Sequence, residues 1–326
     1  MDPRHASDDD EEATSDYDES FVLSEFTSIH TARLIYSYEH GRRYQSLAHN
    51  RYGMPNDEAE QMREGMKHKL FSDYILDGKL FIAPIPDNPQ KVVDLGTGAG
   101  YWALDVAEKY PSARVIGTDL SPIQPQWAPP NAEFRVEDLE DEHRQWSSIY
   151  AGADLIHARS LLQTVRHPKL LLQRAYENLR PGGWIECHDV VCTVFQEDGT
   201  EYHHHPLHKL YDLINGSFSD VYGWNLPIAT QFPDVLRDIG FVNISQRKNK
   251  VPIGRWHSDA RMREMGLFNQ ILHSEWAANM FIKYEAMGIT ADEADSIGQE
   301  ILDAFNDPNV QAHHIWVDCW AQKPVG

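Results

Sequence analysis

A glycine-rich loop follows a short apolar stretch and holds the residues best suited to bind a ligand. The segment reads VVDLGTGAGYWALDVAEKYP (92–111), in which an apolar strand is followed by three glycines and then by an amphipathic helix. The glycines are Gly96, Gly98 and Gly100. They let the chain turn sharply and bring its backbone close to a ligand where a Cβ atom would collide. A strand, a glycine-rich loop and a helix in this order predict a nucleotide-binding site.

Two details of the loop separate the candidate nucleotides. A dinucleotide site has the spacing G-x-G-x-x-G, but here the third glycine comes one residue early and Tyr101 takes the sixth position. Asp94 stands directly before the loop, where a carboxylate would repel a pyrophosphate and attract the amino group of a methionine moiety. The sequence therefore favours S-adenosylmethionine, and an NAD-dependent oxidoreductase is the weaker alternative. The predicted cofactor contacts on this loop are Asp94, Gly96, Thr97, Gly98 and Gly100.

Further acidic residues follow the next two predicted strands. Asp119 ends the second strand, where a carboxylate can accept hydrogen bonds from both ribose hydroxyls, and Leu120 follows it. Asp138 and Leu139 come just after the third strand, so we expect Asp138 near the adenine amine and Leu139 against the ring. Each carboxylate alone could be a helix cap or a solvated loop charge. Because ligands of parallel sheets bind at the carboxyl ends of the strands, the set together predicts a cofactor site.

Histidines are the main candidates for catalysis. His157 is predicted to end the fourth strand, where a neutral imidazole could accept a proton from the methyl acceptor. The alternative for His157 is a pocket-shaping role, and for His188, at the end of the fifth strand, a structural role is preferred. The run 203–205 with His208 suggests a metal cluster, but three adjacent histidines cannot easily face one ion. No cysteine or carboxylate is spaced to complete the site, so we predict no metal.

Strand and helix patterns alternate along the middle of the chain, which predicts an α/β fold with a mainly parallel sheet. The four prolines of SPIQPQWAPPN (121–131) lack amide donors, so no normal helix is expected there. The predicted helices cover 57–76, 99–110, 168–179 and 233–239. The predicted strands cover 91–95, 113–119, 132–136, 153–157, 183–194, 241–246 and 312–322.

The rest of the chain divides into a tail and a lid. Residues 1–20 carry nine acidic groups and one arginine, so we predict a disordered acidic tail. Residues 21–326 form one predicted domain, in which 21–85 and 251–311 are helical lid elements over the sheet. The lid includes a capping box at Thr290-Ala291-Asp292-Glu293.

Composition excludes several functions. The net charge is −21, and the body without its tail still carries about −13, which disfavours direct binding to a nucleic-acid backbone. No apolar run is long enough to span a membrane. The N-terminus lacks the pattern of a signal peptide, and the three cysteines form no CxxC pair. We therefore expect a cytoplasmic or nuclear protein.

Several stretches together resemble the fungal LaeA family of methyltransferase-like proteins, which act in or regulate secondary metabolism. The resemblance covers roughly residues 30–250 and implies a Rossmann-like, seven-stranded class I methyltransferase sheet that binds S-adenosylmethionine. It also suggests that Arg43 and Tyr44 fold back over the cofactor. The matching stretches are EHGRRYQ (39–45), RYGMPNDEAEQMR (51–63), DLGTGAGYWALDVAEKYP (94–111), VIGTDLSPIQPQWAPPN (115–131), DLIHAR (154–159) and LRPGGWIE (179–186).

The resemblance leaves two functions open. The first is a methyltransferase that modifies a small, apolar or aromatic secondary metabolite under the aromatic lid. The second is a regulator of secondary metabolism that acts through protein partners. An enclosed pocket beside the methyl group would favour the enzyme, and a shallow open face would favour the regulator.

Overall fold

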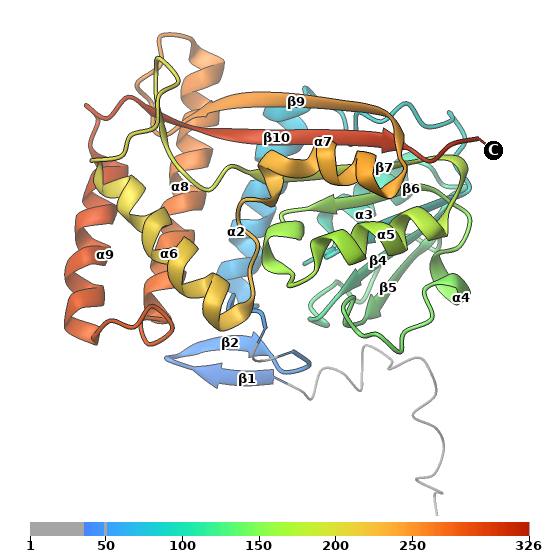
Figure 1. Cartoon of the computed structure of the whole chain (residues 1–326), viewed down its shortest axis with the longest axis horizontal. Helices are drawn as coiled ribbons and strands as arrows, with labels where there is room; N and C mark the ends of the chain where they lie inside the picture. The colour runs from blue at the N-terminus through green and yellow to red at the C-terminus, as the bar shows by residue number, and fades with distance from the viewer. Residues whose placement is uncertain (1–35, 49–50, 326) are drawn as a thin grey trace, which may run out of the picture.

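The computed structural model describes residues 36–48 and 51–325, and its centre is a mixed sheet (Figure 1). The predicted acidic tail lies outside the described residues. The strand order is β5-β4-β3-β6-β7-β10-β8, and β9 pairs with β10. The first five strands of this order are parallel, whereas β10 runs antiparallel to β7 and to β9. The strand bounds are β3 Lys91–Leu95, β4 Arg114–Asp119, β5 Ala132–Val136, β6 Ala153–Arg159, β7 Leu179–Val190, β8 Phe195–Gln196, β9 Val242–Pro252 and β10 Ala312–Gln322.

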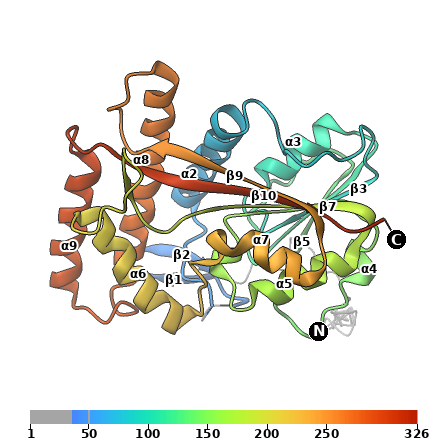
Figure 2. The same ribbon diagram turned by 45° about the horizontal axis from the view of Figure 1, so that its top comes forward.

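Alternate residues of the central strands pack on opposite faces of this sheet. On one face Val92 and Leu155 meet α3 (Tyr101–Lys109). On the other face Val93 and Ile156 meet α5 (Pro168–Asn178) and α7 (Ile228–Ile239). Figure 2 shows α3 on one side of the sheet and α5 and α7 on the other. Because both faces are covered, the central strands are almost continuously apolar, as expected for a buried parallel sheet. The predicted α/β fold with a mainly parallel, Rossmann-like sheet is confirmed, and the short β8 adds an eighth strand to the seven expected.

The segment that precedes the sheet is only partly helical. The helix predicted for residues 57–76 is present as α2 (Glu58–Lys69), which continues as the π-helix η1 (Leu70–Ile75). The expectation of a helical lid element over 21–85 is wrong for residues 36–45, which form the antiparallel hairpin of β1 (Tyr36–Glu39) and β2 (Arg42–Gln45). The turn between these strands places His40 and Gly41 at φ +48° and +77°, a conformation that a helix cannot contain.

The later insertions form a helical layer at one end of the sheet. Its helices are α6 (Pro206–Tyr222), α8 (Ala260–Ile282) and α9 (Ala291–Asn306), which lie together in both views (Figures 1 and 2). They share a hydrophobic cluster that includes Phe218 and Met280. The predicted capping box is present, with the Thr290 and Glu293 side chains each bound to the other's backbone.

The sequence misplaced some element ends. β7 begins four residues earlier than predicted, because Leu179 already pairs with Ala153 of β6. β9 continues to Pro252, because it pairs along its length with the long strand β10. α7 begins at Ile228, so Pro233 lies inside the helix instead of opening it. No helix among the described residues has the length and apolar character needed to cross a membrane.

Candidate functional site

The glycine loop between β3 and α3 depends on left-handed backbone conformations. Gly96, Gly98 and Gly100 have φ angles of +67°, +58° and +86°. A Cβ atom on Gly100 would lie 2.8 Å from the ring of Phe134, and one on Gly96 would lie 2.9 Å from the side chain of Leu161. The glycines therefore allow both the sharp turn and close packing against β5 and the segment after β6.

Asp119 ends β4 beside this loop. Its Oδ2 accepts a hydrogen bond from the Gly98 N–H at 2.8 Å, and its Oδ1 accepts one from the Ser121 N–H at 2.8 Å. Burial raises the pKa of this carboxyl to about 6. Each carboxylate oxygen can accept a second hydrogen bond, so Asp119 can bind a pair of neighbouring hydroxyl groups.

The proline-rich segment after β4 braces the loop. It contains no helix between Ser121 and Asn131, as its four prolines predicted. The buried Gln124 side chain donates hydrogen bonds to the carbonyls of Gly98 (2.6 Å) and Ser121 (2.9 Å). The segment therefore connects β4 to β5 without a helix, and its Gln124 side chain holds the glycine loop in place.

A cavity with about 610 Å³ of empty space borders this loop, and we call it the loop cavity. Five residues predicted to contact the cofactor line it: Gly96, Asp119, Leu120, Asp138 and Leu139. Thr97, Gly98 and Gly100 instead shape the loop behind it. The other lining residues are Ala48, Arg51, Tyr52, Glu137, Glu140, Ser160, Leu161, Thr164 and Val165.

The charge of the loop cavity matches a cationic ligand. Four of its described lining residues are carboxylates, and one is a cation, Arg51. The Arg51 guanidinium is bound to Asp138 and lies 3.6 Å from Glu140. This cation is already paired, so a pyrophosphate would meet net negative charge whereas a sulfonium would be attracted. The residues therefore fit S-adenosylmethionine better than NAD.

Arg51 and Tyr52 are site residues that the sequence analysis missed. Arg51 holds Asp138, whose Oδ1 accepts a hydrogen bond from the Glu140 N–H at 2.9 Å. Asp138 thus lies at the predicted place but carries a partner that the sequence did not suggest. Arg51 and Tyr52 are the first two residues of RYGMPNDEAEQMR (51–63), one of the stretches that resemble the LaeA family. This resemblance was the signal in the sequence that could have identified them.

Asp94 and His157 lie behind the loop and do not line the loop cavity. The Asp94 carboxylate binds the His157 Nδ1 at 2.7 Å and accepts a hydrogen bond from the Thr97 hydroxyl at 2.6 Å. Asp94 is thus held behind the loop and does not line the loop cavity, so its expected contact with a methionine amino group stays a prediction. Burial raises the pKa of Asp94 to about 6.

The expected position of His157 at the rim is wrong, because β6 continues to Arg159 and encloses the imidazole. The ring stacks on Trp102 with centroids 3.8 Å apart, and it is 1% exposed. Burial and the neighbouring His188 hold the pKa of His157 well below its usual value. His157 thus positions Asp94 and, through it, the glycine loop, and its geometry does not suit proton transfer from a substrate.

Tyr44 and Arg43 also have other partners than expected. The Lys283 ammonium lies 3.9 Å from the centre of the buried Tyr44 ring, and Tyr44 is absent from the lining of the loop cavity. The Arg43 guanidinium donates to the Asn56 side chain and backbone. Asn56 in turn donates to the Ser121 hydroxyl at 3.2 Å. Through Asn56 the hairpin is therefore linked to Ser121, whose N–H donates to the cavity-lining Asp119.

A second cavity, with about 690 Å³ of empty space, lies between the sheet and the helical layer, and we call it the lid cavity. It shares Tyr52, Ser160 and Thr164 with the loop cavity, so the two spaces adjoin. Ser160 has a φ of +53°, which is unusual for a residue with a Cβ and is found mainly where function or packing requires it. The other lining residues are Met54, Arg63, Glu64, Lys67, Gln163, Val190, Cys192, Tyr211, Trp224, Leu226, Leu272, His273, Trp276 and Trp316.

The charged residues of the lid cavity all come from α2. The Arg63 guanidinium and the Lys67 ammonium each lie 2.7 Å from the Glu64 carboxylate. The Glu64 Oε2 would lie 3.7 Å from a Cβ atom on Gly98, which places this carboxylate beside the glycine loop. Glu64, rather than Asp94, therefore offers negative charge on the open side of the loop.

His273 of α8 lines the lid cavity and was missed by the sequence analysis. Its Nδ1 donates to the carbonyl of Asn269 at 2.9 Å, which leaves the lone pair on Nε2. Burial lowers its pKa to about 4, so the imidazole is neutral near pH 7. A buried histidine on a long lid helix carries no local signal, because only the fold brings α8 to the sheet.

His188 forms part of a buried structural network. Its ring lies 2.8 Å from both Glu186 and Asp318, and hydrogen bonds to these carboxylates raise its pKa to about 9 against the effect of burial. Its placement inside the sheet, with β7 continuing to Val190, agrees with the structural role preferred from the sequence.

Comparison with known proteins shows the family of this chain. Residues 62–246 match the family model described as a methyltransferase domain. The chain is 32% identical to the methyltransferase pytC of Aspergillus terreus, over 92% of each protein. It is also 32% identical to the protein-methionine methyltransferase laeA of Emericella nidulans, over 79% of this chain and 68% of that protein. A solved structure of phosphoethanolamine N-methyltransferase 2 from Haemonchus contortus aligns over 82% of this chain and 59% of the other, with 19% identity and a TM-score of 0.47.

Proposed function

The chain belongs to the methyltransferase domain family as a LaeA-like member, and from this premise we propose that it methylates a small, largely aromatic metabolite held in the lid cavity. The observation that carries the proposal is the contact between the two cavities at Tyr52, Ser160 and Thr164. A cofactor in the loop cavity and an acceptor in the lid cavity would meet at this junction.

S-adenosylmethionine, when bound, supplies the electrophilic methyl group. On the protein side, Asp119 would accept the ribose hydroxyls, and Leu120 and Leu139 would pack against the adenine. Asp138 would lie at the adenine edge, where Arg51 fixes its orientation. Glu64 would face the amino group of the methionine moiety, because it lies beside Gly98.

The walls of the lid cavity support an aromatic acceptor. Trp224, Trp276 and Trp316 line it together with Tyr211 and several aliphatic side chains. Flat aromatic surfaces bind aromatic ligands by stacking and exclude water from the reaction. The three charged residues of α2 are paired with one another, so the cavity does not require a charged acceptor. A concave, mostly apolar cavity of this kind favours an enzyme over a regulator that acts only through an open face.

We further propose that His273, in place of His157, accepts a hydrogen bond from an acceptor hydroxyl and so orients its oxygen. The Asn269 carbonyl fixes its tautomer, and the free Nε2 lone pair belongs to a residue that lines the lid cavity. Such a hydrogen bond contributes to a rate that depends on holding the two reactants in line.

Cys192→Trp tests the acceptor site, because Cys192 lines only the lid cavity. The assay follows formation of S-adenosylhomocysteine from S-adenosylmethionine with a panel of small phenols and hydroxylated polyketides. We expect the variant to lose acceptor-dependent turnover while its Kd for S-adenosylmethionine stays within about threefold of wild type, since filling one cavity leaves the other intact. Full turnover in Cys192→Trp would show that the acceptor binds elsewhere.

A further inference from the structure

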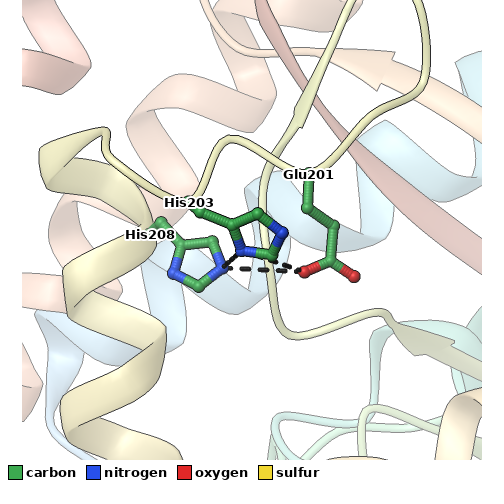
Figure 3. Close-up of side chains that lie close together, drawn as sticks. All are labelled: Glu201, His203 and His208. Atoms are coloured by element: carbon green, nitrogen blue, oxygen red, sulfur yellow. Dashed lines mark hydrogen bonds and ion pairs between the residues drawn. The ribbon is translucent and has the colours of Figure 1, made fainter.

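A cluster of metal-ligating side chains lies outside both cavities. Glu201 and His203 lie in the loop that follows β8, and His208 lies in the first turns of α6 (Figure 3). All three side chains point toward one another across this loop. The prediction that no carboxylate is spaced to complete a metal site here is wrong, because the loop places Glu201 beside His203 and His208.

The distances between the three ligand atoms match those of a transition-metal site. The His203 Nδ1 lies 3.2 Å from the His208 Nε2, and the Glu201 Oε2 lies 3.7 Å from each of these nitrogens. A triangle with these edges has a point about 2 Å from all three corners, and metal–ligand bonds from zinc to imidazole nitrogen and carboxylate oxygen are also about 2 Å. One ion can therefore contact all three atoms with little movement of the side chains.

The surroundings orient one ligand and leave room for another. The His208 Nδ1 lies 3.1 Å from the Asp212 carboxylate, so a proton on Nδ1 directs the Nε2 lone pair toward the cluster. The His203 and Glu201 side chains are 64% and 44% exposed, so a water molecule can complete a fourth position. The remaining histidines of the run are not needed, because His205 caps α6 through the Leu207 N–H and His204 is exposed.

We propose that Glu201, His203 and His208 bind a first-row divalent transition metal of the zinc class. Two imidazoles and one carboxylate suit zinc, cobalt or nickel, whereas magnesium and calcium prefer an all-oxygen shell. The ion joins the loop after β8 to α6, whose Tyr211 lines the lid cavity. The site is separate from the methyl-transfer site and does not depend on the function proposed for it.

The test uses the full chain without a histidine tag, treated with a chelator and then titrated with Zn²⁺ by calorimetry. Co²⁺ is the spectroscopic probe, and Mg²⁺ is the control ion. We expect one Zn²⁺ per chain, a rise in melting temperature on binding, and visible absorption from bound Co²⁺. His203→Ala and Glu201→Gln should each weaken Zn²⁺ binding at least about tenfold, and Asp212→Asn about 10- to 100-fold.

His204→Ala is the matched control, because it removes a histidine of the same run that is not part of the triangle. It should bind Zn²⁺ as the wild type does, and all variants without metal should melt at similar temperatures. The proposal is overturned if the wild type binds no stoichiometric Zn²⁺, or if His204→Ala weakens binding as much as His203→Ala. Either result can be read without any measurement of methyl transfer.

Discussion

Replacement of Asp119 by asparagine tests the cofactor site at its most defined position. Both oxygens of Asp119 accept backbone hydrogen bonds at 2.8 Å, from Gly98 and Ser121. In Asp119→Asn one of these oxygens becomes an NH₂ group, which faces an N–H and cannot accept a hydrogen bond from a ribose hydroxyl.

Two effects of different size follow. The loss of one charge-assisted hydrogen bond to the ligand costs about 1.5–3 kcal/mol, so the Kd for S-adenosylmethionine should rise by about 10- to 150-fold. The backbone N–H left without an acceptor should lower the free energy of unfolding by about 1–3 kcal/mol, whether or not ligand is present. Calorimetric titration measures the first effect, and urea unfolding of the free protein measures the second.

The pH dependence separates a binding role from a merely structural one. The pKa of Asp119 is raised to about 6 in the free protein, and ribose hydroxyls would bind the ionised carboxylate better than the protonated one. Affinity should therefore be constant above about pH 7 and fall by about tenfold one pH unit below the pKa. Asp94 also has a pKa raised to about 6, but it is unchanged in the variant and does not line the loop cavity.

Asp119→Asn should consequently show a weak affinity that changes little with pH in this range. An unchanged Kd in the variant, or a wild-type Kd that is constant down to about pH 5, would refute the assignment of Asp119 to the ribose.

The other predictions concern His273, the loop and the sheet. His273→Ala should lower kcat by about 2- to 10-fold with an unchanged Kd for the cofactor, because one hydrogen bond to the acceptor is lost, whereas His157→Ala should mainly lower the melting temperature. Stopped assays and thermal unfolding distinguish the two variants, and a fully active His273→Ala would exclude this role. Gly100→Ala should lower the free energy of unfolding more than Gly98→Ala, because a Cβ atom on residue 100 would lie 2.8 Å from Phe134, whereas one on residue 98 would meet only Glu64, at 3.7 Å. Equal unfolding free energies of the two variants would contradict this packing. The pKa of His188 is raised to about 9, so its contribution to the free energy of unfolding should be complete below about pH 6.5 and lost as the pH rises through 9. Urea unfolding across this pH range measures the decrease in stability, and His188→Gln should remove it.

The parts of the site that the sequence predicted well are those encoded by local pattern. The strand before Gly96, the helix after Gly100 and the carboxylate at the end of β4 follow one another in the chain, so their spacing alone predicted their arrangement. The prolines after Asp119 also predicted correctly that no helix forms there, because proline lacks the amide donor.

The parts that were missed depend on contacts between distant segments. Arg51 pairs with Asp138 across 87 positions, and His273 reaches the lid cavity from a helix that follows the sixth strand of the sequence pattern. His157 was misplaced because the apolar pattern does not show that β6 continues two residues further, which buries the imidazole against Trp102. The sequence does not predict the hairpin at 36–45, because four-residue strands are too short for their alternation to be distinguished from helical spacing.

The measurement that tests the central proposal most directly is the fate of an isotopically labelled methyl group. The full chain is incubated with S-adenosylmethionine labelled on its methyl carbon and with a metabolite extract from a filamentous fungus, and the small molecules are then separated from protein. We predict that the label appears in a small aromatic product, that Asp119→Asn lowers its yield at limiting cofactor, and that Cys192→Trp abolishes it. Label found only in protein, or equal product from Cys192→Trp, would contradict the account.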